Sequence, residues 1–286
     1  MEFAPRKILS LIDLSQASAN VLKWTRLFAE KFGSEVQILH AMWPPVPRSV
    51  TEAEGEQLLG EFEERRVELR RAIRAQADEV FGRIRCEIAV GVGHPVKVVL
   101  DGIGQVRPEL IVLGSHGHDG MARSLMGSVA ENVVRESAFP TLVVKGADLT
   151  PGQQTLNRLL CPVDLTQSAA EFLDASASLA SRFGASLEVF RVLPDGAADV
   201  EQEMDRLQQW VPDLVRQRCP ISETVHTGDT AEQIVIFARQ RAVDIMVVGV
   251  EPRRFLEYTV LGRTTERVLR HGPCSVLLLR LEPGSN

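Results

Sequence analysis

The sequence predicts an α/β protein built from two tandem, doubly wound, five-stranded parallel sheets of Rossmann-like type. Two observations predict this class: a long internal repeat, and the alternation, within each copy, of short aliphatic runs with longer segments of helical period. Strands that are buried on both faces are continuously apolar, and their alternation with helices is typical of βαβ units. Because crossovers between parallel strands are right-handed, few topologies remain.

The internal repeat divides the chain into two similar halves. A segment that contains Asp13 aligns with one that contains Asp164 at a constant offset of 151 residues, and a later segment from Gly93 aligns with one from Gly228 at an offset of 135. The second copy is therefore 16 residues shorter between its second strand and Gly228. We interpret the chain as a duplication.

The repeat sets the expected domains and strands. We expect domains at residues 1–147 and 156–283, joined by a polar stretch that contains Pro and Gly. The expected strands of the two copies are residues 7–14, 35–42, 84–91, 109–115 and 141–145, then 158–165, 186–193, 222–227, 244–250 and 275–280.

Helix signals fill the intervals between these strands. Residues 15–32 and 166–183 each begin with a hydroxyl residue suited to an N-cap and end at a phenylalanine followed by glycine. Residues 51–83 have apolar positions at helical spacing and predict one long amphipathic helix. Its many charges indicate a solvated face, and partner binding by that face is the alternative.

Composition excludes several classes of function. A formal net charge of −6 and a pI near 5.6 argue against non-specific nucleic-acid binding. The first apolar run contains Asp13 and lacks the layout of a secretory signal, and no apolar stretch approaches the roughly 18 residues that span a bilayer. The four cysteines are scattered singly, as expected of reduced thiols that pack as small apolar side chains. We expect a cytoplasmic protein without membrane contact.

A glycine-rich segment after the fourth strand of the first copy is the strongest functional signal. Gly114, Gly117, Gly127 and Ser128 form the pattern G-x2-G-x9-G-S. Glycines let a backbone approach a phosphate closely, and the following helix N-terminus offers unpaired N–H groups to an anion. The alternative is that these glycines only permit a long connection. The segment is not a P-loop, because no GKS or GKT follows.

This motif, with an aspartate at the end of the first strand, resembles the ATP-binding subgroup of the universal stress protein family. The resemblance covers nearly the whole chain and implies an adenine-nucleotide α-hydrolase-like sheet with ATP across its carboxyl edge. It also implies a role for individual residues: Asp13 near the adenosine, Ala41 against the adenine, and Gly114, Gly117, Gly127, Ser128 and Val129 around the phosphates.

Two of these residues have alternatives that the sequence leaves open. The Asp13 carboxylate can accept hydrogen bonds from ribose hydroxyls, or it can cap the first helix. His116 lies beside Gly117 and can donate to a phosphate oxygen, or it can face solvent. Nothing near His116 completes a metal site, so we expect no resident metal.

The second copy departs from the motif. Pro252 replaces the second glycine and Arg263 replaces the serine. Proline removes an N–H group and fixes φ, so we do not expect triphosphate binding there. Arg253, Arg254 and Arg263 could hold another anion or pair with acidic residues of the first copy.

The resulting hypothesis is a stress-response regulatory protein that binds ATP, ADP or AMP in its N-terminal domain, with or without Mg²⁺. No nucleophile and base pair is recognisable, so dedicated catalysis is not expected, although weak ATP hydrolysis is an option. The alternatives are a nucleotide-free scaffold and an adenylating or ATP-hydrolysing enzyme of the same superfamily. The family resemblance also implies that the last strands of the two copies pair within the chain, and exposed apolar edges tend to find a partner. The alternative is that a loop covers each edge. A whole-chain homodimer and an unknown protein partner are further expectations.

Overall fold

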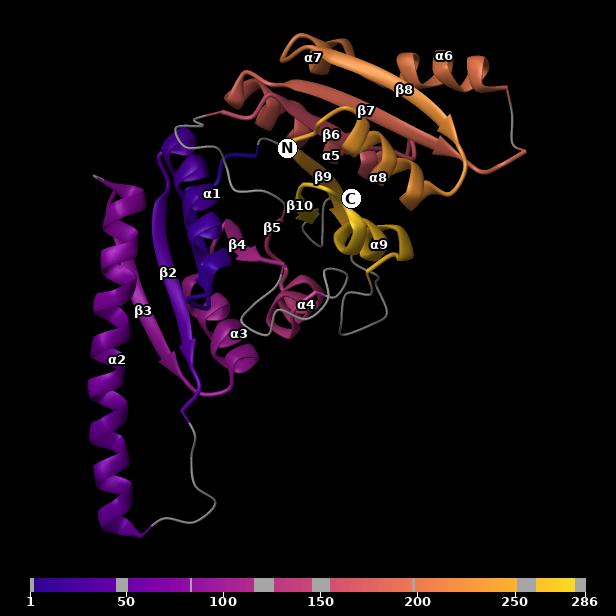
Figure 1. Cartoon of the computed structure of the whole chain (residues 1–286). Coiled ribbons are helices and arrows are strands. Elements are labelled where there is room, and N and C mark those ends of the chain that lie inside the picture. The colour runs from indigo at the N-terminus through magenta and orange to yellow at the C-terminus, as the bar shows by residue number, and fades with distance from the viewer. Residues whose placement is uncertain are drawn as a thin grey trace.

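Ten strands form one sheet among the described residues. The computed structural model describes residues 3–44, 51–82, 84–115, 126–145, 155–196, 199–250 and 261–280. The strand order is β3-β2-β1-β4-β5-β10-β9-β6-β7-β8 (Figure 1). Each half therefore has the same order, with its first strand in the middle. Neighbouring strands are parallel except at the centre, where the halves meet.

In the first half, strands alternate with helices along the chain. The elements are β1 (Lys7–Ile12), α1 (Gln16–Phe32), β2 (Glu35–Met42), α2 (Glu52–Phe81), β3 (Cys86–Val92), α3 (Pro95–Val106), β4 (Leu110–Gly114), α4 (Ser128–Glu136) and β5 (Thr141–Val144).

The second half repeats this order with a shorter second crossover. Its elements are β6 (Arg158–Pro162), α5 (Gln167–Phe183), β7 (Ser186–Leu193), α6 (Val200–Trp210), α7 (Asp213–Arg216), β8 (Ile221–Thr227), α8 (Thr230–Gln240), β9 (Ile245–Val250), α9 (Arg263–His271) and β10 (Ser275–Arg280). The predicted shortening lies here: α2 has 30 residues, whereas α6 and α7 have 11 and 4.

Helices cover both faces of the sheet, which confirms the doubly wound α/β class. On one face, α1, α2 and α5 contribute to a buried cluster that runs across both halves, with Phe28, Ile73 and Leu173 among its members. On the other face, separate clusters form under α3 and α4 and under α8 and α9. Among the described residues, no helix combines the length and the hydropathy needed to cross a membrane.

The two halves join through their last strands, as the sequence predicts. β5 and β10 pair antiparallel, with Leu142 opposite Leu277 at the centre of the pairing. Lys145, directly after β5, donates from Nζ to the carbonyls of Leu269 and Gly272 at the end of α9 in the other half. Burial lowers the pKa of this lysine to about 8. Backbone and side-chain contacts thus tie the halves together.

A second junction lies where α1 and α5 end. The Phe183 ring lies 5.4 Å from the Phe28 ring and 6.2 Å from the Phe32 ring, measured between centroids. Lys31 lies over the Phe183 ring at 5.5 Å, and Arg182 lies over the Phe32 ring at 5.6 Å. Because the 151-residue offset relates Phe32 to Phe183 and Lys31 to Arg182, the contacts are reciprocal.

Several observed element bounds differ from the expected ones by one to three residues. The first strand of each half ends early, because Leu14 and Leu165 have positive φ angles of 65° and 64°, which extended strands do not have. The four cysteines are buried, and desolvation raises the pKa of Cys161 to about 11. They behave as apolar core residues, as expected.

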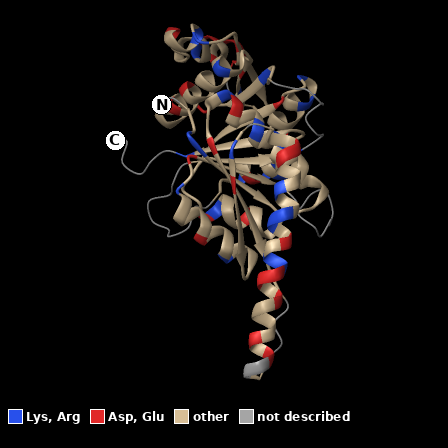
Figure 2. Cartoon of the chain, turned by 90° about the vertical axis from the view of Figure 1, so that its left-hand side faces the viewer, with Lys and Arg blue, Asp and Glu red and all other residues tan. Residues whose placement is uncertain are grey.

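The long amphipathic helix is present and begins with a capping box between Thr51 and Glu54. One part of α2 projects past the sheet, and acidic and basic residues alternate along it (Figure 2). Arg70 and Arg74 donate to the carbonyls of Ile88 and Cys86 on β3, the outermost strand of the first half. α2 therefore covers that edge of the sheet as well as its face.

Candidate functional site

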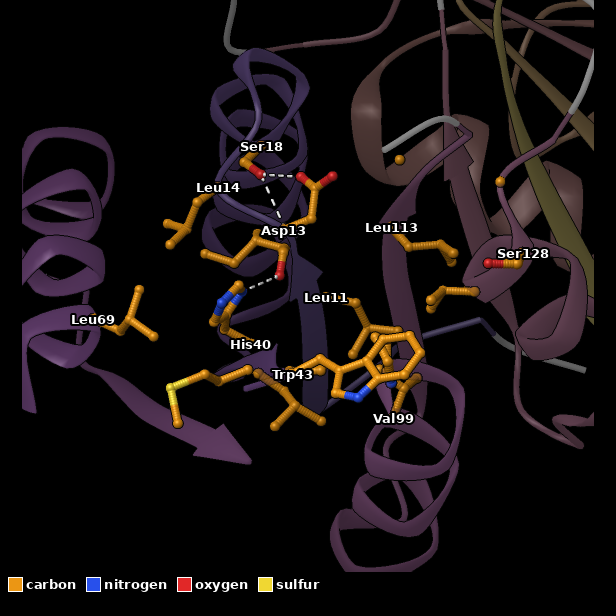
Figure 3. Close-up of a pocket in the computed structure, with 18 of the residues that line it drawn as sticks. Leu11, Asp13, Leu14, Ser18, His40, Trp43, Leu69, Val99, Leu113 and Ser128 are labelled. Atoms are coloured by element: carbon orange, nitrogen blue, oxygen red, sulfur yellow. Dashed lines mark hydrogen bonds between the residues drawn. The ribbon is translucent and has the colours of Figure 1, made fainter. Parts of the chain in front are cut away.

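A cavity of about 1300 Å³ opens at the carboxyl ends of β1, β2 and β4 in the first half. In open parallel sheets, ligands bind at this edge, where crossovers leave to opposite faces. Figure 3 shows the cavity between Leu69 of α2 on one side and Ser128 of α4 on the other, with Asp13 between them. The lining is mostly apolar, with a few polar groups from β2, α2 and the starts of α1 and α4, as is usual for small-molecule sites.

The structure brings six of the predicted site residues to this cavity. They come from the ends of β1, β2 and β4 and from the first turn of α4. These six residues are Asp13, Ala41, Gly114, Gly127, Ser128 and Val129. His116 and Gly117, the other two, lie outside the described residues.

Asp13 both supports the start of α1 and lines the cavity. Its Oδ1 accepts hydrogen bonds from the backbone N–H of Ser15 at 3.0 Å and from the hydroxyl of Ser18 at 2.9 Å. Ser15 is the N-cap residue by position, but its side chain makes no capping hydrogen bond. The two alternatives for Asp13 are therefore compatible, since a carboxylate can accept several hydrogen bonds at once.

The N-terminus of α4 forms the opposite polar wall. Gly127 is the N-cap residue, without a side-chain cap, and its N–H bonds to the carbonyl of Ser115 at 2.9 Å. Ser128 and Val129 follow as the first helical residues, and both line the cavity. The first N–H groups of a helix lack intrahelical partners and carry partial positive charge, so this wall suits an anion.

Apolar side chains from two faces of the sheet form the rest of the lining. Towards α3 and α4 these residues are Leu11, Leu39, Val99, Leu113 and Ala130, which also belong to the buried cluster of that face. Towards α1 and α2 they are Ile12, Val21, Met42, Phe62 and Leu69, which belong to or pack against the cluster of the other face. Both clusters therefore reach the carboxyl edge of the sheet.

Some lining residues were missed by the sequence analysis. Trp43, directly after β2, lines the cavity, as does His40, whose Nδ1 lies 3.0 Å from the carbonyl of Ile12. Leu58 and Phe62 of α2 also line it; the sequence placed them on the apolar stripe of an amphipathic helix but did not connect that stripe with the site. The alternation of side chains along β2 could have indicated His40, but which wall α2 forms depends on packing.

In the second half, larger side chains occupy two positions that correspond to cavity-lining residues of the first half. Phe172, which corresponds to Val21, packs so closely on Gly249 that a Cβ there would lie 2.0 Å from its ring. Arg191, which corresponds to His40, forms an ion pair with Glu203 of α6 at 3.0 Å. Pro252, Arg253 and Arg254 lie outside the described residues. The two halves thus differ in the packing of side chains around this site as well as in the glycine motif.

Across the described part of the chain, no three His, Cys, Asp or Glu side chains group closely enough to hold a metal ion. The polar groups of the cavity are hydroxyls, the carboxylates of Asp13 and Glu61, the Arg65 guanidinium, the His40 ring and helical N–H groups, which suit a polar organic ligand.

Comparisons with known proteins agree with this architecture. A model of the universal stress protein family matches residues 5–145 and 155–280, one match for each half. A universal stress protein of Mycobacterium tuberculosis is 26% identical over 262 residues, which cover 84% of this chain and 83% of that protein.

The fold is shared with a solved structure over nearly the whole chain. A universal stress protein from Archaeoglobus fulgidus aligns with 96% of this chain and 98% of its own, with 19% identity and a TM-score of 0.74. A universal stress protein solved in complex with cAMP aligns with 50% of this chain and 98% of its own, with 23% identity and a TM-score of 0.36.

Proposed function

The chain belongs to the universal stress protein family, and from this premise we propose that it is a regulatory protein whose first half binds ATP or a related adenine nucleotide. One observation carries the proposal: the single cavity described above gathers Asp13, Ala41, Gly114, Gly127, Ser128 and Val129 from four separate elements. Binding, rather than turnover, is the proposed activity.

The lining suits the base, the ribose and the phosphates of such a ligand. The apolar floor around Leu11, Leu39 and Val99 offers a surface for the base, beside Ala41. The carboxylate of Asp13 can accept hydrogen bonds from ribose hydroxyls. The N-terminus of α4 and the Ser128 hydroxyl can donate to phosphate oxygens. If the nucleotide is ATP, Mg²⁺ would come with its phosphates rather than from a protein site.

Occupancy of this cavity can reach the rest of the chain through α1. The start of α1 is held by the Asp13 carboxylate, and its end packs against α5 of the second half through Phe28 and Phe32. A ligand that bonds to Asp13 therefore acts on the same helix that contacts the other half. We propose that nucleotide occupancy is signalled to a partner through this helix.

The test is to denature freshly purified protein and identify the released nucleotide by mass spectrometry. We expect an adenine nucleotide from the wild type and little from Gly127→Val, because a branched side chain at the N-cap blocks close approach of a phosphate. The assignment of ATP, ADP or AMP follows from the mass.

Gly262→Val is the matched control. Gly262 is the N-cap residue of α9, as Gly127 is of α4, and a Cβ added there would have no heavy atom within 4 Å. We expect this variant to release as much nucleotide as the wild type. Equal yields from Gly127→Val and the wild type would contradict the proposal.

A further inference from the structure

Trp43 is a large apolar side chain that the fold leaves uncovered. It follows the last residue of β2 directly, and 63% of its surface is exposed. It nevertheless lines the cavity. An indole ring is a costly group to leave in water, and tryptophan is enriched where a ligand or partner covers it.

The side chain of Trp43 lies on the same side of the cavity as the apolar floor. Side chains alternate along a strand, so Trp43 shares the face of Ala41 and Leu39, two and four residues before it. Figure 3 shows its indole on the side of the cavity that carries Val99 and Leu113, away from Leu69 of α2. This is the side on which Ala41 was predicted to contact the base.

A contact at the rim supports the indole from one side. The His94 ring packs against it in a T-shaped arrangement, with 4.8 Å between centroids. His94 is the N-cap residue of α3 and is followed by Pro95, so its backbone is fixed by the start of that helix. The indole is thus braced on one edge while most of its surface stays open.

We propose that Trp43 stacks on the base of the bound nucleotide and makes the site selective for purine nucleotides over phosphates alone. This inference rests on the proposed function. Ala41 bears only a methyl group and leaves space above the strand end, where a flat base can lie on Leu11 and Val99. A planar ring beside that space supplies the aromatic contact that aliphatic floor residues lack.

The experiment compares two ligands on three proteins. Isothermal titration calorimetry measures the affinity of wild type, Trp43→Ala and Trp43→Phe for ATP and for inorganic tripolyphosphate. Stacking of one base on an aromatic side chain corresponds to about 5- to 150-fold in affinity. We expect Trp43→Ala to lose this factor for ATP but not for tripolyphosphate, and Trp43→Phe to recover most of it.

A fluorescence measurement gives an independent readout. The other tryptophans are Trp24, buried in the core of the first half, and Trp210 of α6 in the second half. We therefore expect ATP to change the tryptophan emission of the wild type but not that of Trp43→Phe. Leu59→Ala is the control and should show the same change of emission as the wild type. Leu59 is 65% exposed on α2 and is not among the lining residues.

The outcomes separate the two proposals. If the wild type bound no adenine nucleotide, the proposed function would fail, and the stacking role with it. If the wild type bound ATP and Trp43→Ala bound it equally well, only the stacking role would fail. An equal loss of affinity for ATP and tripolyphosphate in Trp43→Ala would also overturn it, because a base contact cannot affect a ligand without a base.

Discussion

Corresponding aspartates of the two halves make similar local contacts but face different surroundings. Asp13 accepts from the backbone of Ser15 and from the hydroxyl of Ser18, while Asp164 accepts from the backbone and the hydroxyl of Thr166. Of the two, Asp13 is the one that lines the large cavity. The duplication therefore supplies an internal control for the role of this carboxylate.

We expect Asp13→Ala to weaken ATP binding by about 10- to 150-fold, the range of a hydrogen bond to a charged group. Asp164→Ala should leave the affinity unchanged. Both variants should lose about 1 kcal/mol of stability, because each removes an acceptor at the start of a helix. Calorimetric titration with ATP and urea denaturation measure the two effects. Equal ATP affinity in the two variants would show that Asp13 serves α1 only.

At the scale of elements, α2 has two functions in the fold. Its apolar side chains Leu58, Phe62 and Leu69 form a wall of the cavity. Arg70 and Arg74 donate to β3 carbonyls at 3.1 to 3.3 Å, and these carbonyls lie on the outermost strand of the first half. An exposed strand edge is a template for pairing with another chain, and charged side chains over it hinder that pairing.

We expect the double variant Arg70→Ala/Arg74→Ala to lose about 2 kcal/mol of stability and to aggregate faster on warming, because two hydrogen-bonding groups and the cover of the edge are removed. Thermal denaturation followed by light scattering measures both. The control is Arg66→Ala/Arg71→Ala, which removes the same charge from α2 but keeps the contacts to β3. Similar scattering from the two double variants would contradict a protective role for Arg70 and Arg74.

The sequence predicted the helices and strands better than it predicted the side-chain contacts between them. The positions of the ten strands along the chain and the long helix follow from apolar runs and the repeat, because these signals are local or periodic, whereas the pairing of the last strands was expected from the family resemblance. Of the six predicted residues that line the cavity, the glycines, Ser128 and Asp13 were named for their local chemistry, and Ala41 and Val129 only through the family resemblance. Trp43 and Phe62 were missed, since a lone aromatic or a helix face acquires its role only from tertiary packing.

Side-chain packing in the second half illustrates this limit. Substitutions in the glycine motif predicted that the second half lost the site. The structure adds Phe172, whose ring packs on Gly249, and the ion pair between Arg191 and Glu203. In the sequence these residues look like ordinary core and surface positions. Their correspondence to Val21 and His40 follows from the 151-residue offset, but the contacts that they make follow only from tertiary packing.

At the scale of the whole molecule, the two halves form an internal dimer with two junctions. One is the antiparallel pairing of β5 with β10 at the centre of the sheet. The other is the aromatic contact between the ends of α1 and α5. Because α1 also begins at the cavity, the second junction links the candidate site to the second half of the chain.

We expect this junction to couple the stabilities of the two halves. Phe32 and Phe183 lie 6.2 Å apart between ring centroids, so their substitutions should not be additive. In a double-mutant cycle with alanine, measured by urea denaturation, the interaction energy should be about 0.5–3 kcal/mol. The control pair is Phe32 and Phe237, because Phe237 stacks on Phe190 in the cluster of the other face. That pair should be additive within about 0.5 kcal/mol. Additivity of Phe32 and Phe183 would mean that this ring pair does not couple the two halves, and the proposed route from α1 to the second half would then have to run through other contacts such as that of Phe28 with Phe183.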